Sequence, residues 1–345
     1  MLILSLIALF AATVTIIAPG AAAVDGPIFT AVPDYRSYIA LGDSYSLGVG
    51  LGSFSKYLPH QPEGCNRTDD SFPSLFNQLF KPGNFQWESC LGHDNDFIRP
   101  LTVDLPPPKS DPELGLISIT FGLNYKDMFK NISDVCIFNP IITNTTHLRS
   151  LWDPACDLTL KAAETTIRHM QPAIEEMIQN VKSQVVQGQQ LTHIVLMGYP
   201  RLFNIHRRCT TEYINWLRYP TKGHGGTRDR INHLVVKLNK KLEAAAINMN
   251  ITYRDTDRGF EGRRLCDHKG GFEENLCEGD FPILMPSAPE WSWGGCWYNP
   301  GVLHPNRIGQ GIYLNNLMEV AANDGHILAQ LRSHNSNNTR LGRAF

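Results

Sequence analysis

The stretch Ser37-Tyr38-Ile39-Ala40-Leu41-Gly42-Asp43-Ser44-Tyr45-Ser46 joins a short apolar run to a tight turn that carries a serine. Short apolar runs bounded by turn residues are typical of buried strands in α/β proteins. We therefore predict a strand over 38–41, with Ser44 exposed just beyond its end. A hydroxyl in that position, beside backbone N–H groups, is suited to act as a nucleophile.

The rest of the chain alternates between predicted strands and helices. Apolar runs predict buried strands over 116–121 and 193–197. Between them, apolar residues recur every three or four positions, so we predict a helix over 158–187 that Pro172 should kink or break. A second amphipathic helix is predicted over 228–247. This alternation favours a parallel sheet with crossover helices.

Three further residues could complete a hydrolytic site with Ser44. Asn124 follows the predicted strand 116–121, and its side-chain amide could donate to an oxyanion. Gly92 could present its N–H to the same place. His304 lies in a loop before the apolar segment 311–320, and because strand and loop ends meet at one edge of a sheet, it could reach the serine. Each motif alone also fits an ordinary turn or an exposed loop.

Together these pieces resemble the four blocks of the SGNH hydrolases, also called the GDSL family. The blocks are Gly42-Asp43-Ser44, Gly92, Gly122-x-Asn124 and His304-Pro305-Asn306, and the resemblance, which includes Gly198-Tyr199-Pro200, runs from about Tyr35 to about Val320. It implies a three-layer α/β/α flavodoxin-like fold with a central parallel sheet, and a serine ester hydrolase without cofactor or metal. By this resemblance Ser44 is the nucleophile and His304 the general base and then acid. The oxyanion hole would consist of the Ser44 N–H, the Gly92 N–H and the Asn124 amide.

The sequence departs from the family pattern near two of these blocks. Tyr125 stands where the family often has Asp, and Gly301 stands three residues before the histidine, where an Asp is usual. The second difference removes the usual carboxylate of a triad. We predict a Ser–His dyad in which the Gly301 carbonyl orients His304, with Glu290 and Asp280 as alternative carboxylate partners.

Two rival hypotheses are open to test. The ordinary α/β-hydrolase fold carries its nucleophile in Gly-x-Ser-x-Gly, and this sequence lacks that pentapeptide. The other rival is a catalytically silent secreted binding glycoprotein on the same fold. This hypothesis is motivated by Gly301 and by Arg263, which stands where the Phe-x-Gly-His segment of the family usually has its histidine. Labelling of Ser44 by a fluorophosphonate would distinguish the enzyme from the binder.

The N-terminal segment and the cysteines indicate export. An apolar run over 1–18, a Pro-Gly break and Ala21-Ala22-Ala23 predict a signal peptide over 1–23, and a membrane anchor is disfavoured because a spanning helix needs ~20 apolar residues. Eight cysteines agree with an oxidising compartment. Sequons, which indicate a glycoprotein, lie at Asn66, Asn131, Asn144, Asn250 and Asn337. Eight cysteines allow 105 connectivities, and the sequence does not fix which one forms. Pairing near neighbours that flank loops favours Cys65–Cys90, Cys136–Cys156 and Cys266–Cys277, which leaves Cys209 with Cys296.

We expect one SGNH hydrolase domain over 24–332 of the 345 residues, with loop insertions near 99–112 and 130–156 and a disordered tail over 333–345. The net charge of −2, with both signs interspersed, gives no electrostatic case for nucleic acid or for an anionic membrane surface. We expect a secreted monomer without an integral membrane segment after signal removal. Its substrate would be a small-molecule, lipid or polysaccharide ester.

Overall fold

The computed structural model describes residues 35–51, 65, 67–90, 114–138, 149–185, 191–205, 226–265, 267 and 303–323. Several predictions lie outside these residues. They are the signal peptide, the 99–112 insertion, the tail, the pairs Cys266–Cys277 and Cys209–Cys296, and the residues Gly92, Asp280, Glu290 and Gly301.

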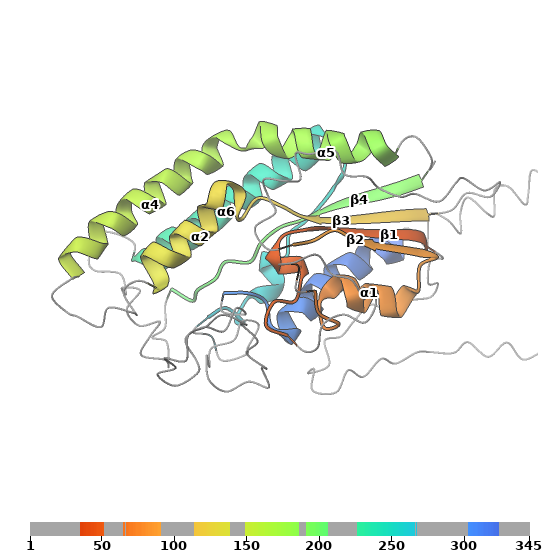
Figure 1. The fold of residues 1–345 in the computed structure, drawn as a ribbon, viewed down its shortest axis with the longest axis horizontal. Coiled ribbons are helices and arrows are strands. Elements are labelled where there is room, and N and C mark those ends of the chain that lie inside the picture. The colour runs from red at the N-terminus through yellow and green to blue at the C-terminus, as the bar shows by residue number, and fades with distance from the viewer. Residues whose placement is uncertain are drawn as a thin grey trace, which may run out of the picture.

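Five parallel strands form the central sheet, in the order β2-β1-β3-β4-β5 (Figure 1). They are β1 (Tyr35–Gly42), β2 (Asn84–Trp87), β3 (Leu114–Thr120), β4 (Leu191–Met197) and β5 (Thr252–Arg254). The three predicted strands are confirmed as β1, β3 and β4, and each begins earlier in the chain than predicted. The short outer strands β2 and β5 were not predicted from the sequence.

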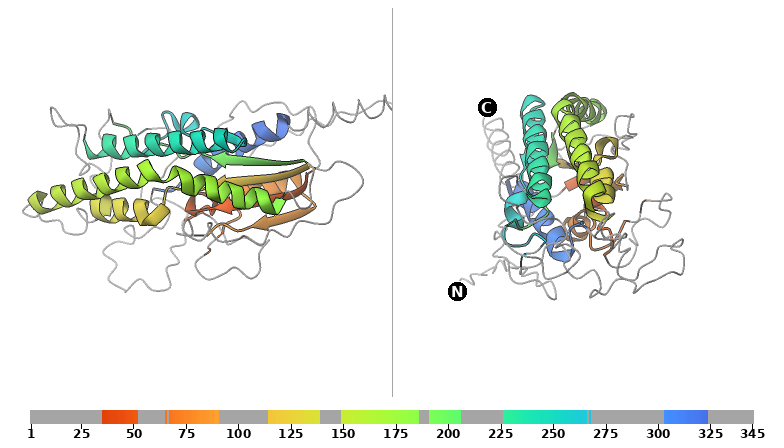
Figure 2. Two further views of the ribbon diagram at one scale, coloured as in Figure 1. Left: turned by 90° about the horizontal axis from the view of Figure 1, so that it is seen from above. Right: turned by 90° about the vertical axis from the view of Figure 1, so that its left-hand side faces the viewer.

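Helices cover both faces of the sheet, which confirms the three-layer α/β/α fold (Figures 1 and 2). One face carries α1 (Phe72–Phe80) and the helix 307–323. The other carries α2 (Met128–Ile132), α4 (Arg149–His169), α5 (Gln171–Val185) and α6 (Thr227–Asn248). Figure 2 shows α6 lying alongside α4 and α5. Shorter helical turns are η1 (Ser44–Ser46), η3 (Tyr125–Asp127), η4 (Ser133–Phe138) and η7 (Asp257–Phe260).

The long predicted helix consists of two helices. It begins at Arg149 instead of 158, ends at His169, and resumes as α5 after Met170. Pro172 lies in the first turn of α5, where the missing N–H has no intrahelical partner to lose. The predicted break is therefore confirmed, and α6 matches the second predicted helix to within one residue at each end.

The segment predicted as the second loop insertion, 130–156, contributes to the core instead of lying wholly on the surface. Among its described residues, α2 runs into the π-helix η4, and α4 begins at Arg149. Ile132 and Ile137 are buried, so the segment adds apolar contacts as well as a crosslink. Its predicted disulfide, Cys136–Cys156, is confirmed, as is Cys65–Cys90.

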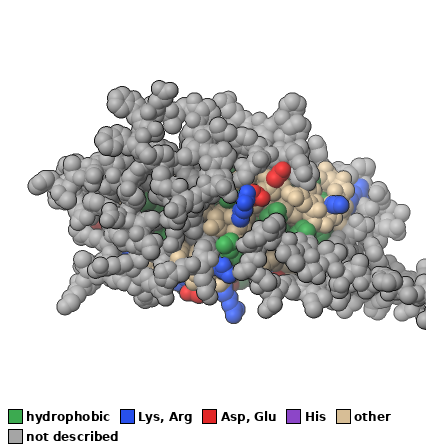
Figure 3. Space-filling view, turned by 90° about the horizontal axis from the view of Figure 1, so that it is seen from below, with side chains coloured by type: hydrophobic (Ala, Val, Ile, Leu, Met, Phe, Trp, Pro, Cys, Tyr) green, Lys and Arg blue, Asp and Glu red, His purple; other side chains and the backbone are tan. Residues whose placement is uncertain are grey.

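Within the described ranges, no helix has the length and apolar character needed to cross a membrane. Figure 3 shows the face on which α1 and helix 307–323 lie, where the described residues include Lys, Arg, Asp and Glu side chains. Both signs of charge are thus present on that face.

Candidate active site

Ser44 begins the turn η1 directly after the carboxyl end of β1. The Asp43 carboxylate caps this turn, because its Oδ1 accepts a hydrogen bond from the Tyr45 N–H at 3.0 Å. Gly42 is required by close packing, since a Cβ there would lie 2.1 Å from Oγ1 of Thr120. The sequence therefore forms a tight turn that leaves Ser44 half-buried at the sheet edge.

His304 meets this serine from a position 260 residues further along the chain: its Nε2 lies 2.8 Å from Oγ of Ser44. When Nε2 accepts from the hydroxyl, the ring carries its proton on Nδ1, which is the arrangement of a general base. The histidine lies three residues before the start of helix 307–323. Asn306 caps that helix, since its Oδ1 accepts from the N–H groups of Ile308 and Gly309.

Asn124 lies at the same edge of the sheet, after β3. The two strands β1 and β3 pair in register as far as Gly42 and Thr120, so their carboxyl ends are level. Gly122 turns the chain there with φ +117°, a conformation that favours glycine. The Oδ1 of Asn124 accepts from the Lys130 N–H at 3.2 Å. This bond fixes the amide orientation and leaves Nδ2 as its donor end.

The segment that leads from β2 toward Gly92 runs alongside β1. Beyond β2, the Glu88 N–H donates to Ala40 O at 2.8 Å and the Cys90 N–H to Gly42 O at 3.1 Å. The disulfide with Cys65 ties this segment down. Gly92 itself lies outside the described residues, so its place in the oxyanion hole stays a prediction.

A buried polar group beneath Ser44 was missed by sequence analysis. The Oδ2 of Asp43 accepts from the Tyr199 hydroxyl at 2.5 Å. Tyr199 is fixed in turn by Asn239 of α6, whose amide bonds both its N–H and its carbonyl. The Tyr199 and Tyr45 rings meet edge to face, with their centroids 5.2 Å apart. The available signal was the tyrosine in each of the motifs Gly-Asp-Ser-Tyr and Gly-Tyr-Pro.

Burial raises the pKa of Asp43 to about 6, and the Tyr199 hydrogen bond opposes this shift. Between about pH 4 and pH 6 the unfolded chain releases a proton that the folded chain retains, so this group lowers stability as pH rises through that window. We expect the free energy of unfolding of Asp43→Asn to rise by about 1–3 kcal/mol relative to the native chain across this pH window. The Asn variant can keep the bond from the Tyr45 N–H, and its Nδ2 can donate to the Tyr199 hydroxyl in place of the bond that Asp43 accepts.

Denaturant unfolding at a series of pH values measures this difference. The control is Asp229→Asn at an exposed position on α6, whose stability should follow the native pH dependence. Equal pH dependence for Asp43→Asn and the native chain would contradict the expectation.

No three His, Cys, Asp or Glu side chains in the described ranges are grouped so as to hold a metal ion. The site at this edge of the sheet places a hydroxyl beside an imidazole, with an amide donor after the neighbouring strand. This combination suits nucleophilic attack on an acyl group.

No family model matches the sequence. The chain is 26% identical over 280 residues to Lipase 1 of Streptomyces coelicolor, covering 80% of this chain and 84% of that protein. The crystal structure of phospholipase A1 from Streptomyces albidoflavus has a TM-score of 0.58 at 22% identity, covering 83% of this chain and 99% of that one. An extracellular lipase from Streptomyces rimosus gives a TM-score of 0.57 at 21% identity, covering 82% and 99%.

The two structures show the same fold, and the sequence relative shows descent over most of the chain. Together with the motif order described above, these likenesses support the resemblance to the SGNH hydrolases, also called the GDSL family.

Proposed function

We propose that this chain is a secreted serine carboxylic-ester hydrolase, an esterase or lipase, that works through Ser44 and His304. The observation that carries the proposal is the 2.8 Å contact between His304 Nε2 and Ser44 Oγ at the carboxyl edge of a parallel sheet. A serine hydroxyl is a weak nucleophile by itself, and a neighbouring base that takes its proton activates it.

In the proposed reaction, Ser44 Oγ attacks the ester carbonyl while its proton moves to His304 Nε2. The charge that develops on the carbonyl oxygen is stabilised by the Ser44 N–H, the Gly92 N–H and Nδ2 of Asn124. The histidine then gives the proton to the departing alcohol. Water, activated by the same histidine, hydrolyses the acyl-enzyme and restores Ser44.

His304 also needs an acceptor at Nδ1 to hold the productive tautomer. We propose that the Gly301 carbonyl fills this role and that no carboxylate completes a triad. Replacing Glu290 by Gln and Asp280 by Asn, one at a time, should then leave kcat within about tenfold of native. A loss near the ~10⁴-fold seen when a triad Asp is neutralised would instead identify that carboxylate as the orienting group.

The secretion proposal rests on the apolar leader, the cysteine content and the two confirmed disulfides, which form and persist in oxidising compartments. The Streptomyces rimosus enzyme of the same fold is an extracellular lipase. We propose that the mature chain is a glycosylated, monomeric, single-domain protein over 24–332.

A fluorophosphonate probe tests the proposed nucleophile. The native chain should be labelled and Ser44→Ala should not, while Ser183→Ala, at an exposed serine on α5, should be labelled like the native chain. Hydrolysis of p-nitrophenyl esters, acetylated xylan and phospholipid by the same three proteins gives the substrate class. A native chain that is neither labelled nor active would favour the silent binding glycoprotein.

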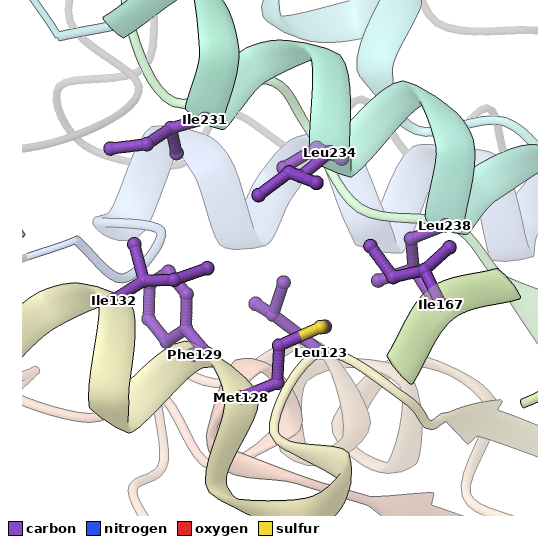
Figure 4. A pocket seen from close by; sticks show the side chains of 9 residues that line it. Leu123, Met128, Phe129, Ile132, Ile167, Ile231, Leu234 and Leu238 are labelled. Atoms are coloured by element: carbon purple, nitrogen blue, oxygen red, sulfur yellow. The ribbon is translucent and has the colours of Figure 1, made fainter. Parts of the chain in front are cut away.

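A small apolar cavity lies next to the segment that carries Asn124 (Figure 4). Its lining comes from the segment after β3, from α4 and from α6. The lining residues are Leu123, Met128, Phe129, Ile132, Ile167, Ile231, Leu234, Val235 and Leu238. Leu123 immediately precedes Asn124, and Phe129 precedes the residue whose N–H holds the Asn124 amide. The cavity thus lies within the apolar packing that supports the segment carrying Asn124.

A further inference from the structure

Tyr45 connects the two halves of the Ser44–His304 pair. It follows Ser44 directly and is 0% exposed. Its hydroxyl donates to the carbonyl of Leu303, the residue before His304, at 2.9 Å. Its own carbonyl accepts from Nε2 of Gln310, in the first turn of the helix after His304, at 3.0 Å. These two links join the serine turn to segments on both sides of the histidine.

Leu303, whose carbonyl binds Tyr45, has an unusual backbone conformation in the loop that carries His304. Leu303 has φ +66°, in the left-handed region that residues with a side chain adopt at a cost. Such a conformation persists only where its surroundings fix it. The carbonyl of Leu303 belongs to the peptide unit that leads into His304. The Tyr45 hydroxyl therefore fixes the orientation of the peptide unit between Leu303 and His304.

Tyr45 is itself held on several sides. Its N–H donates to Asp43 Oδ1 at 3.0 Å, and its ring meets the Tyr199 ring edge to face. The His304 ring lies 5.4 Å from the Tyr45 ring, centroid to centroid. Burial, together with the Asp43 charge, raises the pKa of Tyr45 well above its usual range. The hydroxyl thus keeps its proton and remains a donor.

We propose that Tyr45 is a positioning residue, which holds the His304 loop against the serine turn through its hydroxyl on Leu303 and its carbonyl on Gln310. This inference rests on the proposed roles of Ser44 and His304. A buried hydroxyl that donates to the backbone touches no substrate. Loss of the link should therefore disturb proton transfer between Ser44 and His304 without changing substrate binding.

Tyr45→Phe removes only the hydroxyl. We expect kcat on a p-nitrophenyl ester to fall about 10- to 100-fold, the range expected for a misplaced catalytic group. The KM should stay within about twofold of native, because no ground-state contact to substrate is lost. The matched control is Tyr38→Phe in β1, where the buried hydroxyl is hydrogen-bonded to Ser118 Oγ at 2.9 Å, remote from His304 in the sheet. The Tyr38→Phe variant loses a comparable hydrogen bond and should keep native kcat.

A double-mutant cycle separates positioning from a merely structural role. If Tyr45 acts through His304, then Tyr45→Phe should not lower the residual activity of His304→Ala any further, because the group it positions is already gone. A drop of the same size with and without His304 would overturn the proposal. If Tyr45→Phe fails to fold, Gln310→Met is judged by the same cycle. It breaks the second link together with the bond that Gln310 accepts from the Phe72 N–H at the start of α1.

The failures of the two proposals are distinguishable. Full activity in Ser44→Ala would reject the proposed function and this inference with it. An inactive Ser44→Ala, combined with kcat for Tyr45→Phe within about twofold of native, would reject only the inference.

Discussion

Replacing His304 by Ala is expected to lower kcat by about 10⁴-fold or more, because the Ser44 hydroxyl loses its only base within hydrogen-bonding distance among the described side chains. Since serine and histidine act as one unit, Ser44→Ala should cost about as much, and the double variant should be no worse than either single one. Steady-state hydrolysis of a p-nitrophenyl ester measures all three.

The control for this prediction is His169→Ala, at an exposed position near the end of α4, which should keep native kcat. Thermal unfolding of each variant separates loss of chemistry from loss of fold. A His304→Ala protein that retains more than about one per cent of native kcat would remove this histidine from the role of general base.

Asn124→Ala should lower kcat by about 10²- to 10³-fold with little change in KM, the pattern expected when an interaction forms only with the oxyanion. The Oδ1 of Asn124 also accepts from the Lys130 N–H, so the Ala variant loses a structural bond as well. Asn124→Asp keeps an acceptor for that bond but places negative charge beside the oxyanion. It should therefore fold well and be at least as inactive.

Asn248→Ala, near the exposed end of α6, is the matched control and should keep native kcat. Full activity in Asn124→Asp would show that the amide does not contact the developing charge. Inactivity of the Ala variant caused by unfolding alone would appear as a lower melting temperature, with native kcat in the Asp variant.

The centre of the sheet could be predicted because β1, β3 and β4 are buried apolar runs with turn residues after them. The outer strands could not. β2 reads Asn-Phe-Gln-Trp and its first three residues are only half-buried, while β5 has three residues, so neither produces a recognisable apolar run. α1 was also missed, although Ser71 caps it and Pro73 lies in its first turn. A nine-residue helix is too short to show clear periodicity.

Part of the candidate site could likewise be predicted from the sequence, and part could not. Ser44, Asn124 and His304 could be proposed from the sequence because each follows or precedes a recognisable element and carries a residue suited to ester hydrolysis. The bond from Tyr45 to Leu303 spans 258 residues and depends on how the histidine loop closes over the sheet edge. A local pattern contains no information on that closure. The same holds for Tyr199, which reaches Asp43 across 156 residues.

The distance along the chain between Ser44 and His304 also has a consequence for biosynthesis. A ribosome makes β1 early, whereas residues 303–323 come last among the described elements. A nascent chain therefore carries the serine long before it carries the base, and the Tyr45 hydroxyl has as yet no Leu303 carbonyl to hold. Under the proposed mechanism, the incomplete polypeptide does not hydrolyse esters inside the cell that makes it. Activity begins only when the final helix packs beneath the sheet.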